Sequence, residues 1–426
     1  MERYSEYKDS GVKWLGEIPS HWEVVRGLAV FSENKNKNTQ LENSIVLSLS
    51  YGKIIVKKDI DSGLVPEEYS SYQIVKPGFI IVRSTDLQND KTSLRIGYVC
   101  NEGIITSAYL GLQVKGNNND KYLYYFLHDW DITKEIYRHG NGLRQSLSWN
   151  DLRDVNVLLP PLSEQDAIVR YLDAATSKID KAIAMQQKMI DLLNERKQII
   201  IQNAVTKGLD ENVEMKDSGV EWIGMIPKHW EILKLKRCAS IKTGTTPPTN
   251  ERKYFDGGRI SWFTPGDLND LHLKFASKTI TQKAIDDKVG RLFPAKTIYF
   301  VGIGATVAKV SACEFAASSN QQINAIICNE SLDYIFATYV LKSEQEFIRN
   351  MANYVTLPII NQSDTGLIDM IVPPKSEQQA IVAYLVGKEM QRFDSAISNC
   401  QRQITLLQER KQIIINEVVT GKVKVS

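Results

Sequence analysis

The chain has 426 residues, of which 43 % are hydrophobic and 24 % are charged, and its formal net charge is +2. A chain of this length suggests roughly two to four domains, and its apolar content is ordinary, so each half can bury a core. The near-neutral charge weakens any prediction of strong, non-specific nucleic-acid binding, which needs many basic groups on phosphates.

Membrane and disulfide-stabilised classes are not expected. No run of about 18 apolar residues is present, and the polar start of the chain lacks the apolar stretch of a signal peptide. The five cysteines are scattered and include no Cys-x-x-Cys pair, which argues against a disulfide framework and a zinc site. A reducing cytoplasm is the expected location, and no metal or other cofactor is expected.

The two halves of the chain carry the same order of predicted elements. Short β-rich runs bounded by turn residues predict strands. In the first half these are 45–49, 78–82, 94–99, 110–114 and 155–159, with a helix over 121–138. In the second half they are 260–263, 297–301, 323–327 and 370–372, with a helix over 332–351. We therefore expect two inserts of different sequence that share one α+β fold.

Three sequence blocks occur twice. Residues 8–23 return at 216–231, residues 160–165 at 373–378, and residues 192–201 at 406–415, with offsets of 208, 213 and 214. Because this period is far longer than a solenoid repeat of about 20 to 50 residues, the repeated unit is a domain with its connector. The His-Trp pairs at 21–22 and 229–230 belong to the first block, and we expect them to pack at a domain edge.

A long helix is predicted after each Pro-Pro pair. Ser163 and Ser376 can cap a helix start, no Pro follows for about 44 residues, and Gly208 and Gly421 suit helix ends. Both stretches carry a heptad seam in the same register, interrupted by Gln186, Lys197 and Lys411. The apolar seam positions are Ile179, Ile183, Ile190, Leu193, Ile200, Phe393, Ile397, Ile404, Leu407 and Ile414. This favours a two-helix coiled coil over a lone amphipathic helix on a globular core.

The predicted architecture is α+β, with two pseudo-twofold-related α/β domains separated by a long antiparallel two-helix coiled coil. The expected boundaries are 1–158 for the first domain, 159–208 for its helix, 209–371 for the second domain and 372–426 for the last helix. Two similar domains on a stiff spacer match the way proteins address two half-sites on a DNA duplex, where the spacer sets the distance.

The repeated blocks carry a family resemblance. The chain resembles the DNA-specificity subunit of type I restriction-modification systems in Lys-Asp-Ser-Gly-Val-x-Trp-x-Gly-x-Ile-Pro-x-His-Trp-Glu, Pro-Pro-x-Ser-Glu-Gln and Leu-Leu-x-Glu-Arg-Lys-Gln-Ile-Ile-Ile. The stretches 244–249 and 260–268 resemble it too, and the resemblance covers essentially the whole chain.

The resemblance implies a subunit without chemistry of its own. It implies two target-recognition domains that each read half of a bipartite double-stranded DNA target, and a coiled coil that measures the unread spacer. It also implies two adenine-methylating modification subunits as partners and, in the full complex, two ATP-driven restriction subunits.

The residues offer little for catalysis. No Gly-x-x-x-x-Gly-Lys-Ser/Thr loop and no Asn/Asp-Pro-Pro-Tyr/Phe tetrapeptide is present. The glycines of 301–305 are interpreted as a tight turn, and the charged run 191–197 as a solvated helix face. Two alternatives stay open: a self-sufficient restriction or methyltransferase enzyme, and a stand-alone DNA binder with two reading domains.

Base reading in the major groove uses Arg or Lys on guanine, Asn or Gln on adenine, and Ser or Thr as adaptable partners. In the first insert the candidates are Arg83, Ser84, Thr85, Arg95, Tyr109, Arg144, Gln145 and Ser146. In the second they are Thr245, Thr246, Arg252, Lys253, Tyr254, Ser319, Asn320, Gln321, Gln322, Asn361, Gln362 and Ser363. For any single residue, a capping, turn or solvent-exposed role is the competing interpretation.

Overall fold

The computed structural model describes residues 2–57, 69–90, 92–140, 145–354 and 357–425, which form two compact units. The first unit comprises residues 1–187 and 401–426, and the second comprises residues 188–400. Each unit therefore contains part of two long helices, α4 (Leu162–Lys207) and α11 (Lys388–Val419). Each is described by itself below.

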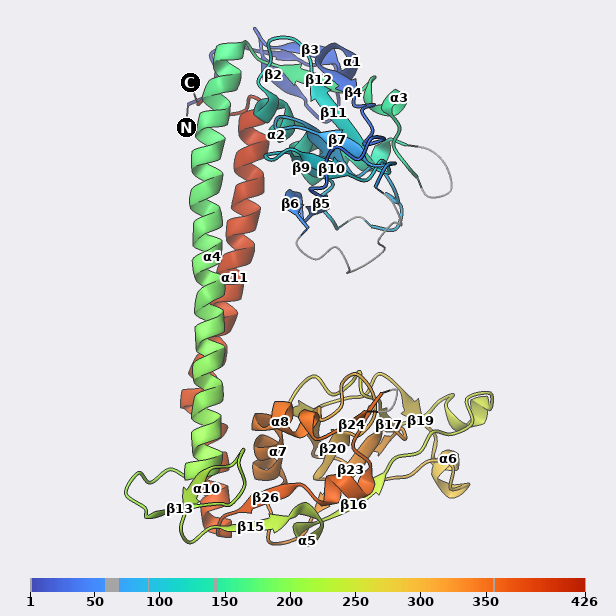
Figure 1. The fold of residues 1–426 in the computed structure, drawn as a ribbon, viewed down its shortest axis with the longest axis vertical. Helices are drawn as coiled ribbons and strands as arrows, with labels where there is room; N and C mark the ends of the chain where they lie inside the picture. The colour runs from blue at the N-terminus through green and yellow to red at the C-terminus, as the bar shows by residue number, and fades with distance from the viewer. Residues whose placement is uncertain (1, 58–68, 91, 141–144, 355–356, 426) are drawn as a thin grey trace. The chain divides into compact units, whose positions relative to one another are not determined.

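The first unit is a mixed α/β domain on a helix pair (Figure 1). Its central sheet has the order β4-β11-β8-β9, with all neighbours antiparallel. The strands of this sheet are β4 (Phe31–Glu33), β8 (Ile80–Val82), β9 (Ile96–Tyr98) and β11 (Leu110–Val114). Helix α2 (Asp120–Ile132) packs on the sheet, and its Tyr122, Phe126 and Trp130 are fully buried in the core.

Smaller elements complete the first unit. They are β1 (Tyr7–Asp9) with β2 (Glu17–Pro19), β3 (Glu23–Arg26) with β12 (Asn156–Leu159), β5 (Leu47–Ser50) with β6 (Lys53–Val56), β7 (Gln73–Val75) with β10 (Gly103–Ile105), and the short helices α1 (Gly27–Val30), η1 (Glu135–Arg138) and α3 (Trp149–Leu152).

The second unit repeats this plan with other residues. Its main sheet has the order β16-β23-β20-β21-β18, and the first four strands follow the same antiparallel order as the sheet of the first unit. The strands are β16 (Ala239–Thr243), β18 (His272–Leu273), β20 (Thr297–Val301), β21 (Val310–Cys313) and β23 (Ile323–Cys328). Helix α7 (Tyr334–Ser343) packs on it as α2 does in the first unit. The prediction that the two inserts share one fold is confirmed.

The other elements of the second unit mostly have counterparts in the first. They are β13 (Met215–Asp217) with β14 (Met225–Pro227), β15 (Glu231–Lys234) with β26 (Asp369–Val372), the trio β17 (Ile260–Phe263), β19 (Thr279–Ile280) and β22 (Ser318–Ser319), β24 (Asn353–Tyr354) with β25 (Pro358–Ile359), and the helices α5 (Leu235–Cys238), η2 (Arg252–Tyr254), α6 (Gln282–Asp286), α8 (Gln345–Asn350), α9 (Gln362–Gly366) and α10 (Lys375–Leu385).

The helix pair is antiparallel within each unit. In the first unit Trp22 contacts both Glu164, at the start of α4, and Gly421, just after α11, while Asp180 pairs with Lys411 further along. In the second unit Trp230 contacts both Gly208, just after α4, and Glu377, at the start of α10. There Lys197 of α4 pairs with Asp394 of α11.

Every predicted seam position is buried or half-buried. The apolar seam residues have this burial in both α4 and α11, and most positions between them are exposed. The three polar residues of the seam, Gln186, Lys197 and Lys411, are half-buried as well. The heptad positions thus mark the more buried side of both helices.

The second long helix differs from its prediction because it is broken. Helix α10 ends at Leu385 and α11 begins at Lys388, with Gly387 between them. The repeat offset changes at the same place, from 213 at Glu377 to 214 at Leu407, so this helix carries one extra residue. One inserted residue would turn the following seam by about 100°. The break at Val386 and Gly387 absorbs it and keeps the seam facing α4.

Candidate nucleic-acid interface

The repeated blocks build the frame that carries the candidate loops. In the first unit the carboxylate of Glu164 accepts hydrogen bonds from Trp22 Nε1 at 3.0 Å and Tyr4 Oη at 2.9 Å, and lies 2.6 Å from His21 Nε2. In the second, Glu377 accepts from Trp230 Nε1 at 2.9 Å and lies 2.7 Å from His229 Nε2. Both tryptophans are fully buried, so their predicted packing role is confirmed.

Burial alone would raise the pKa of Glu164, but the hydrogen bonds from His21, Trp22 and Tyr4 outweigh burial and hold this pKa below its usual value. The carboxylate therefore stays charged at neutral pH. It ties the first repeated block to the start of α4.

The glutamine after each of these glutamates fixes the neighbouring helix start. Gln165 Oε1 accepts from the backbone N–H of Asn119 at 2.8 Å, just before α2. Gln378 Oε1 accepts from the backbone N–H of Asp333 at 2.7 Å, just before α7. The repeated Glu-Gln pair thus sets each insert on its long helix in the same way.

Three loops of the first unit meet around Ser84. Its Oγ donates to the carbonyl of Ala108 at 3.2 Å, next to Tyr109, and its carbonyl accepts from the N–H of Leu147 at 2.8 Å. The carbonyl of Gln145 accepts from the N–H of Leu87 at 3.1 Å. The structure therefore brings together the candidates that follow β8, precede β11 and precede α3.

The individual candidates of this cluster have different environments. Arg83 is partly exposed and lies 3.3 Å from Asp90, Thr85 is half-buried, and Ser146 is exposed. Gln145 has a positive φ, and its amide donates to the carbonyls of Tyr137 at 2.7 Å and His139 at 3.0 Å. Arg144 lies outside the described residues.

Arg95 has a different place from the one expected of a base reader. It is completely buried, and its guanidinium donates to the carbonyls of residues 83, 85, 86 and 90 and to the hydroxyl of Tyr137. A side chain enclosed in this way does not reach a DNA groove. Its geometry is that of a clamp that shapes the loop 83–90, which carries Arg83, Ser84 and Thr85.

The second unit gathers its candidates at the corresponding loops. Thr245 N–H donates to the carbonyl of Ser319 at 2.9 Å, and the hydroxyl of Thr246 bonds the side chain of Gln321. Ser319 and Asn320 are buried, and the Asn320 amide donates to Gln322 Oε1 at 2.9 Å. Gln321 is exposed at the surface of this cluster.

The loop after β20 closes the cluster as the loop after β8 does in the first unit. The N–H of Ile360 donates to the carbonyl of Gly302 at 2.8 Å, and the N–H of Gly304 donates to Pro358 at 3.1 Å. A Cβ on Gly302 would lie 2.7 Å from the carbonyl of Ile360, and Gly304 has φ of +108°. These glycines therefore form the tight turn expected from the sequence.

The remaining candidates of the second unit are divided. Asn361 is exposed, but its side chain caps α9 by accepting from the N–H of Asp364 at 2.9 Å, whereas Gln362 accepts from Thr243 Oγ1 at 3.2 Å. Ser363 is exposed on the first turn of α9. Arg252, Lys253 and Tyr254 form η2, outside this cluster; Arg252 and Lys253 are exposed, and the buried Tyr254 donates to Asp287.

Sequence reasoning missed several exposed groups. Tyr51, at the turn of the β5–β6 hairpin, is 89 % exposed, and Phe275, between β18 and β19, is 79 % exposed. Arg291 donates to the carbonyl of Thr243 at 2.7 Å, and the hydroxyl of the same threonine donates to Gln362. The Tyr-Gly pair at 51–52 between two apolar runs is a hairpin signal that could have indicated Tyr51. Isolated Phe275 and Arg291 carry no such signal.

The described residues contain no group of three or more His, Cys, Asp or Glu side chains arranged to hold a metal ion. Of the helices that the structure describes, none is long and apolar enough to cross a membrane.

Comparisons of the sequence with known proteins match one family along most of the chain. The family model described as "Type I restriction modification DNA specificity domain" matches residues 19–189 and 227–408. The chain is 24 % identical over 455 residues to the putative type I restriction enzyme MjaX specificity subunit of Methanocaldococcus jannaschii, covering 98 % of each chain. It is 24 % identical over 304 residues to the EcoR124I/EcoR124II specificity subunit of Escherichia coli, covering 68 % of each.

A solved structure shares the fold. It is a chain from a structure that concerns complex assembly and conformational transition of the type I R-M system. That chain superposes on this one with a TM-score of 0.70 at 17 % identity. The superposition covers 95 % of this chain and 99 % of that one.

Proposed function

The chain belongs to the type I restriction-modification DNA specificity family, and from this premise we propose that its two units read the two halves of a bipartite DNA target. As a specificity subunit it is not an enzyme by itself. Its task is to give sequence specificity to a complex whose other subunits carry out the chemistry.

One observation carries the proposal. Both units place different side chains on equivalent loops of one fold. The loop after β8 or β20 is hydrogen-bonded to the loop before the short capped helix α3 or α9. In the first unit this is the bond from Leu147 to Ser84, and in the second it is the bond from Ile360 to Gly302. A common frame with different loop residues is what two readers of different half-sites require.

The exposed side chains of these loops suit base edges. In the first unit Arg83 and Ser146 are the accessible candidates, and in the second they are Gln321, Gln362 and Arg291. Arg matches guanine and Gln matches adenine in the major groove. We assign Arg95 and Asn361 to positioning the loops and not to contacting bases.

The paired helices supply the spacer in this proposal. Antiparallel pairing within each unit supports a coiled coil that sets how many unread base pairs separate the half-sites. Such a helix pair also offers repeated surfaces for two modification subunits, and in the full complex for two restriction subunits. Because the target is cellular DNA, the proposal includes a cytoplasmic location.

Exchange of one insert tests the modular part of the proposal. Residues 239–368 would be replaced by the equivalent insert of a relative, and methylated adenines would be mapped in cells that also carry the modification subunit. One half of the methylated sequence should change while the other half stays the same. A change in both halves would contradict separate reading.

Deletion of one heptad from each long helix tests the spacer. Removing 186–192 and 400–406 shortens the helix pair by about 10 Å, equivalent to about three base pairs of duplex. Both half-sites should persist with a shorter gap between them. An unchanged gap in a folded variant would contradict the proposed measuring role.

Experiments on the purified chain, with and without the modification subunit, separate the alternatives. Tight specific binding by the chain alone in gel shifts would favour a stand-alone binder, and methyl transfer by the chain alone would favour an enzyme. We expect tight specific binding, and any methylation, only with the modification subunit present.

A further inference from the structure

Each unit has a small group of three strands beside its main sheet, and the two groups are equivalent. In the first unit β5 pairs antiparallel with β6, and Val46, just before β5, forms a parallel bridge with Ile104 of β10. In the second unit β17 pairs antiparallel with β19 and parallel with β22. Strand β10 directly precedes the central strand β11, as β22 directly precedes β23. The connection from β5 to β6 therefore corresponds to the connection from β17 to β19.

Each of these connections carries one highly exposed aromatic side chain. Tyr51 lies between β5 and β6 and is 89 % exposed, and Phe275 lies between β17 and β19 and is 79 % exposed. Among the large apolar side chains of the described residues, these two are the most exposed. The repeated fold thus places an aromatic ring in water at the same point of both units, although the two connections differ in length and sequence.

Both rings lie at the strand ends that carry the candidate reading loops. Because β17 runs parallel to β22, both strands end on the same side, where Asn320 and Gln321 follow β22. Strand β19 runs the opposite way, so Phe275, shortly before it, lies on this side too. Two strand spacings, about 10 Å or about three base-pair steps, separate β19 from β22. In the first unit the parallel bridge likewise puts Tyr51 beside residues 106–109, which follow β10.

Phe275 is held in position by its neighbours. Leu273, two residues before it, is buried in the core of the second unit. The N–H of Ser277 donates to Asp267 Oδ1 at 2.8 Å, and the N–H and hydroxyl of Thr264 donate to Asp267 Oδ2 at 2.7 and 2.8 Å. The backbone is thus fixed on both sides of the exposed ring, so a contact made by the ring costs little ordering entropy.

The charges beside the rings favour a polyanionic ligand. Lys274 and Lys278 are exposed on either side of Phe275, and Lys53 is exposed two residues after Tyr51. An apolar ring next to exposed cations suits a DNA duplex, because phosphates attract the lysines while the base edges offer apolar surface.

We propose that Tyr51 and Phe275 make equivalent apolar contacts to the two half-sites, and that Phe275 recognises the 5-methyl group of a thymine. The inference rests on the proposed reading function and adds specificity residues to it. The phenylalanine ring has no hydrogen-bonding atom, so it cannot distinguish bases by their donors and acceptors. The thymine methyl is an apolar group displayed in the major groove, the groove that also suits the neighbouring Gln321.

Replacement of thymine by uracil tests this contact, because it removes only the methyl group. Methylation mapping and the insert exchange would identify the half-site of the second unit, and each of its thymines would be replaced singly. Binding would be measured by fluorescence anisotropy on the chain assembled with its modification subunit. Uracil at one position should weaken binding about fourfold, the factor for one buried methyl group. The same replacement should have no effect on the Phe275→Ala complex.

Variants of the chain separate this contact from other roles. Phe275→Ala should weaken binding of the thymine target at least about tenfold. Its melting temperature should stay within about 1 °C of the parent, because the ring is exposed. Lys274→Ala should weaken binding equally on thymine and uracil DNA, since a phosphate contact carries no base information. Tyr51→Ala should leave the uracil effect in this half-site unchanged.

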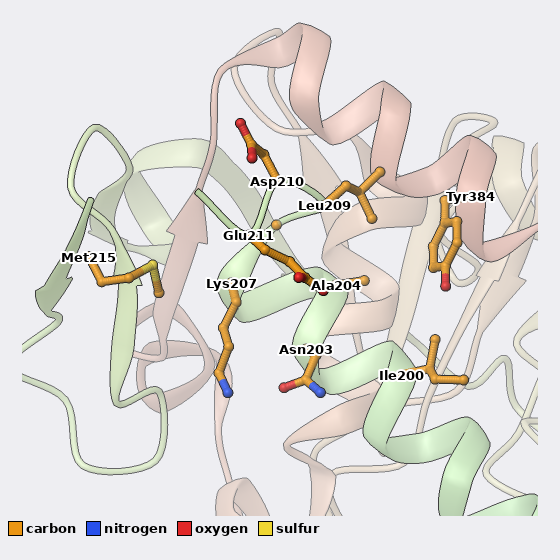
Figure 2. A pocket seen from close by; sticks show the side chains of 10 residues that line it. Ile200, Asn203, Ala204, Lys207, Leu209, Asp210, Glu211, Met215 and Tyr384 are labelled. Carbon is orange, nitrogen blue, oxygen red and sulfur yellow. The ribbon is translucent and has the colours of Figure 1, made fainter. Parts of the chain in front are cut away.

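The matched control is Leu209→Ala. Leu209 is an exposed apolar residue of the second unit that lines a pocket at the end of α4, outside the insert (Figure 2). Its replacement should change neither the affinity nor the uracil effect.

Other results count against the proposal. A parent complex that binds its target specifically but tolerates uracil at every thymine of this half-site, or a half-site without thymine, would overturn the methyl contact and leave the reading function intact. An equal uracil effect in the parent and Phe275→Ala complexes would assign the methyl group to another residue. A complex that does not distinguish its target from scrambled DNA would contradict the reading function itself, and the proposal would fall with it.

Discussion

Lys411 Nζ lies 2.6 Å from Asp180 Oδ1 in the first unit, and the repeat counterpart of this pair, Lys197 with Asp394, is an ion pair in the second. The offset of 214 converts Asp180 into Asp394 and Lys197 into Lys411. The two lysines that interrupt the apolar seam are thus the same element used twice, each pairing across to the other helix.

Replacement of Lys411 by Leu tests what this pair contributes. The lysine side chain is 24 % exposed and the aspartate 41 %, and pairs exposed to this degree contribute about 0–1 kcal/mol. Completing the apolar seam should therefore raise stability by up to about 1 kcal/mol. Thermal unfolding would measure this, with Arg410→Leu, at an exposed position, as the control. A loss of stability well above that of the control would mean that the pair contributes more.

Arg95 should be required for the shape of the loop 83–90. Arg95→Met removes the buried donors of four carbonyls and should cost about 2–4 kcal/mol of stability, because those acceptors lose their partners. In the assembled methyltransferase it should impair recognition of one half-site only. Arg83→Ala, on the same loop, is the control and should weaken DNA binding without a comparable loss of stability.

If Arg95 served only the general stability of the fold, its loss would affect recognition of both half-sites together. Methylation mapped on targets altered in one half at a time therefore separates loop positioning from general destabilisation. Equal loss at both halves would reject the positioning role of Arg95.

Asp129 predicts a pH dependence of stability in the first unit. Burial raises the pKa of Asp129 to about 6, although Asn416 donates to both of its oxygens at 3.1 Å. The folded chain then binds the proton more tightly than the unfolded chain does. The stabilisation of the folded chain by the protonated Asp129 is present below about pH 4 and is lost as the pH rises through about 6.

Asp129→Asn should remove that dependence, because the side chain is then neutral at every pH. The variant should gain about 2–3 kcal/mol at pH 8 relative to the parent and little at pH 4, measured by chemical unfolding. Asp154→Asn, at a side chain 60 % exposed, should show no such difference. A parent protein equally stable at both pH values, after correction with that control, would contradict the assignment.

The repeated residues made much of the fold predictable. Glu164 and Glu377, in one repeated block, each bind the buried tryptophan of another repeated block, and a residue that contacts another repeated residue is constrained in both copies. The heptad seam was predictable because its period reflects the contact surface directly. The break at Gly387 left only a one-residue change of offset as its trace.

The loops proposed to read DNA could be named from the sequence, but the environment of each of their residues could not. Arg83 and Arg95 look alike in sequence, yet one is partly exposed and the other is buried among carbonyls of its own loop. Asn361 and Gln362 are neighbours, and one caps a helix while the other accepts a bond from Thr243. Burial and hydrogen-bond partners depend on long-range packing, which residue type does not encode.

Tyr51 should contribute to DNA affinity and not to folding. It lies at the turn between β5 and β6 with φ of +48°, its side chain is 89 % exposed, and Lys53 follows on an exposed position. An aromatic ring held in water this way gains free energy on contact with another surface, and burying such a ring against a DNA groove contributes about 1.5–3 kcal/mol. Tyr51→Ala should leave the melting temperature within about 1 °C of the parent while weakening DNA binding by the assembled methyltransferase about fivefold or more. Tyr51→Phe keeps the ring and should retain most of the affinity. If the Ala and Phe variants bind DNA equally well, the ring makes no contact with the target.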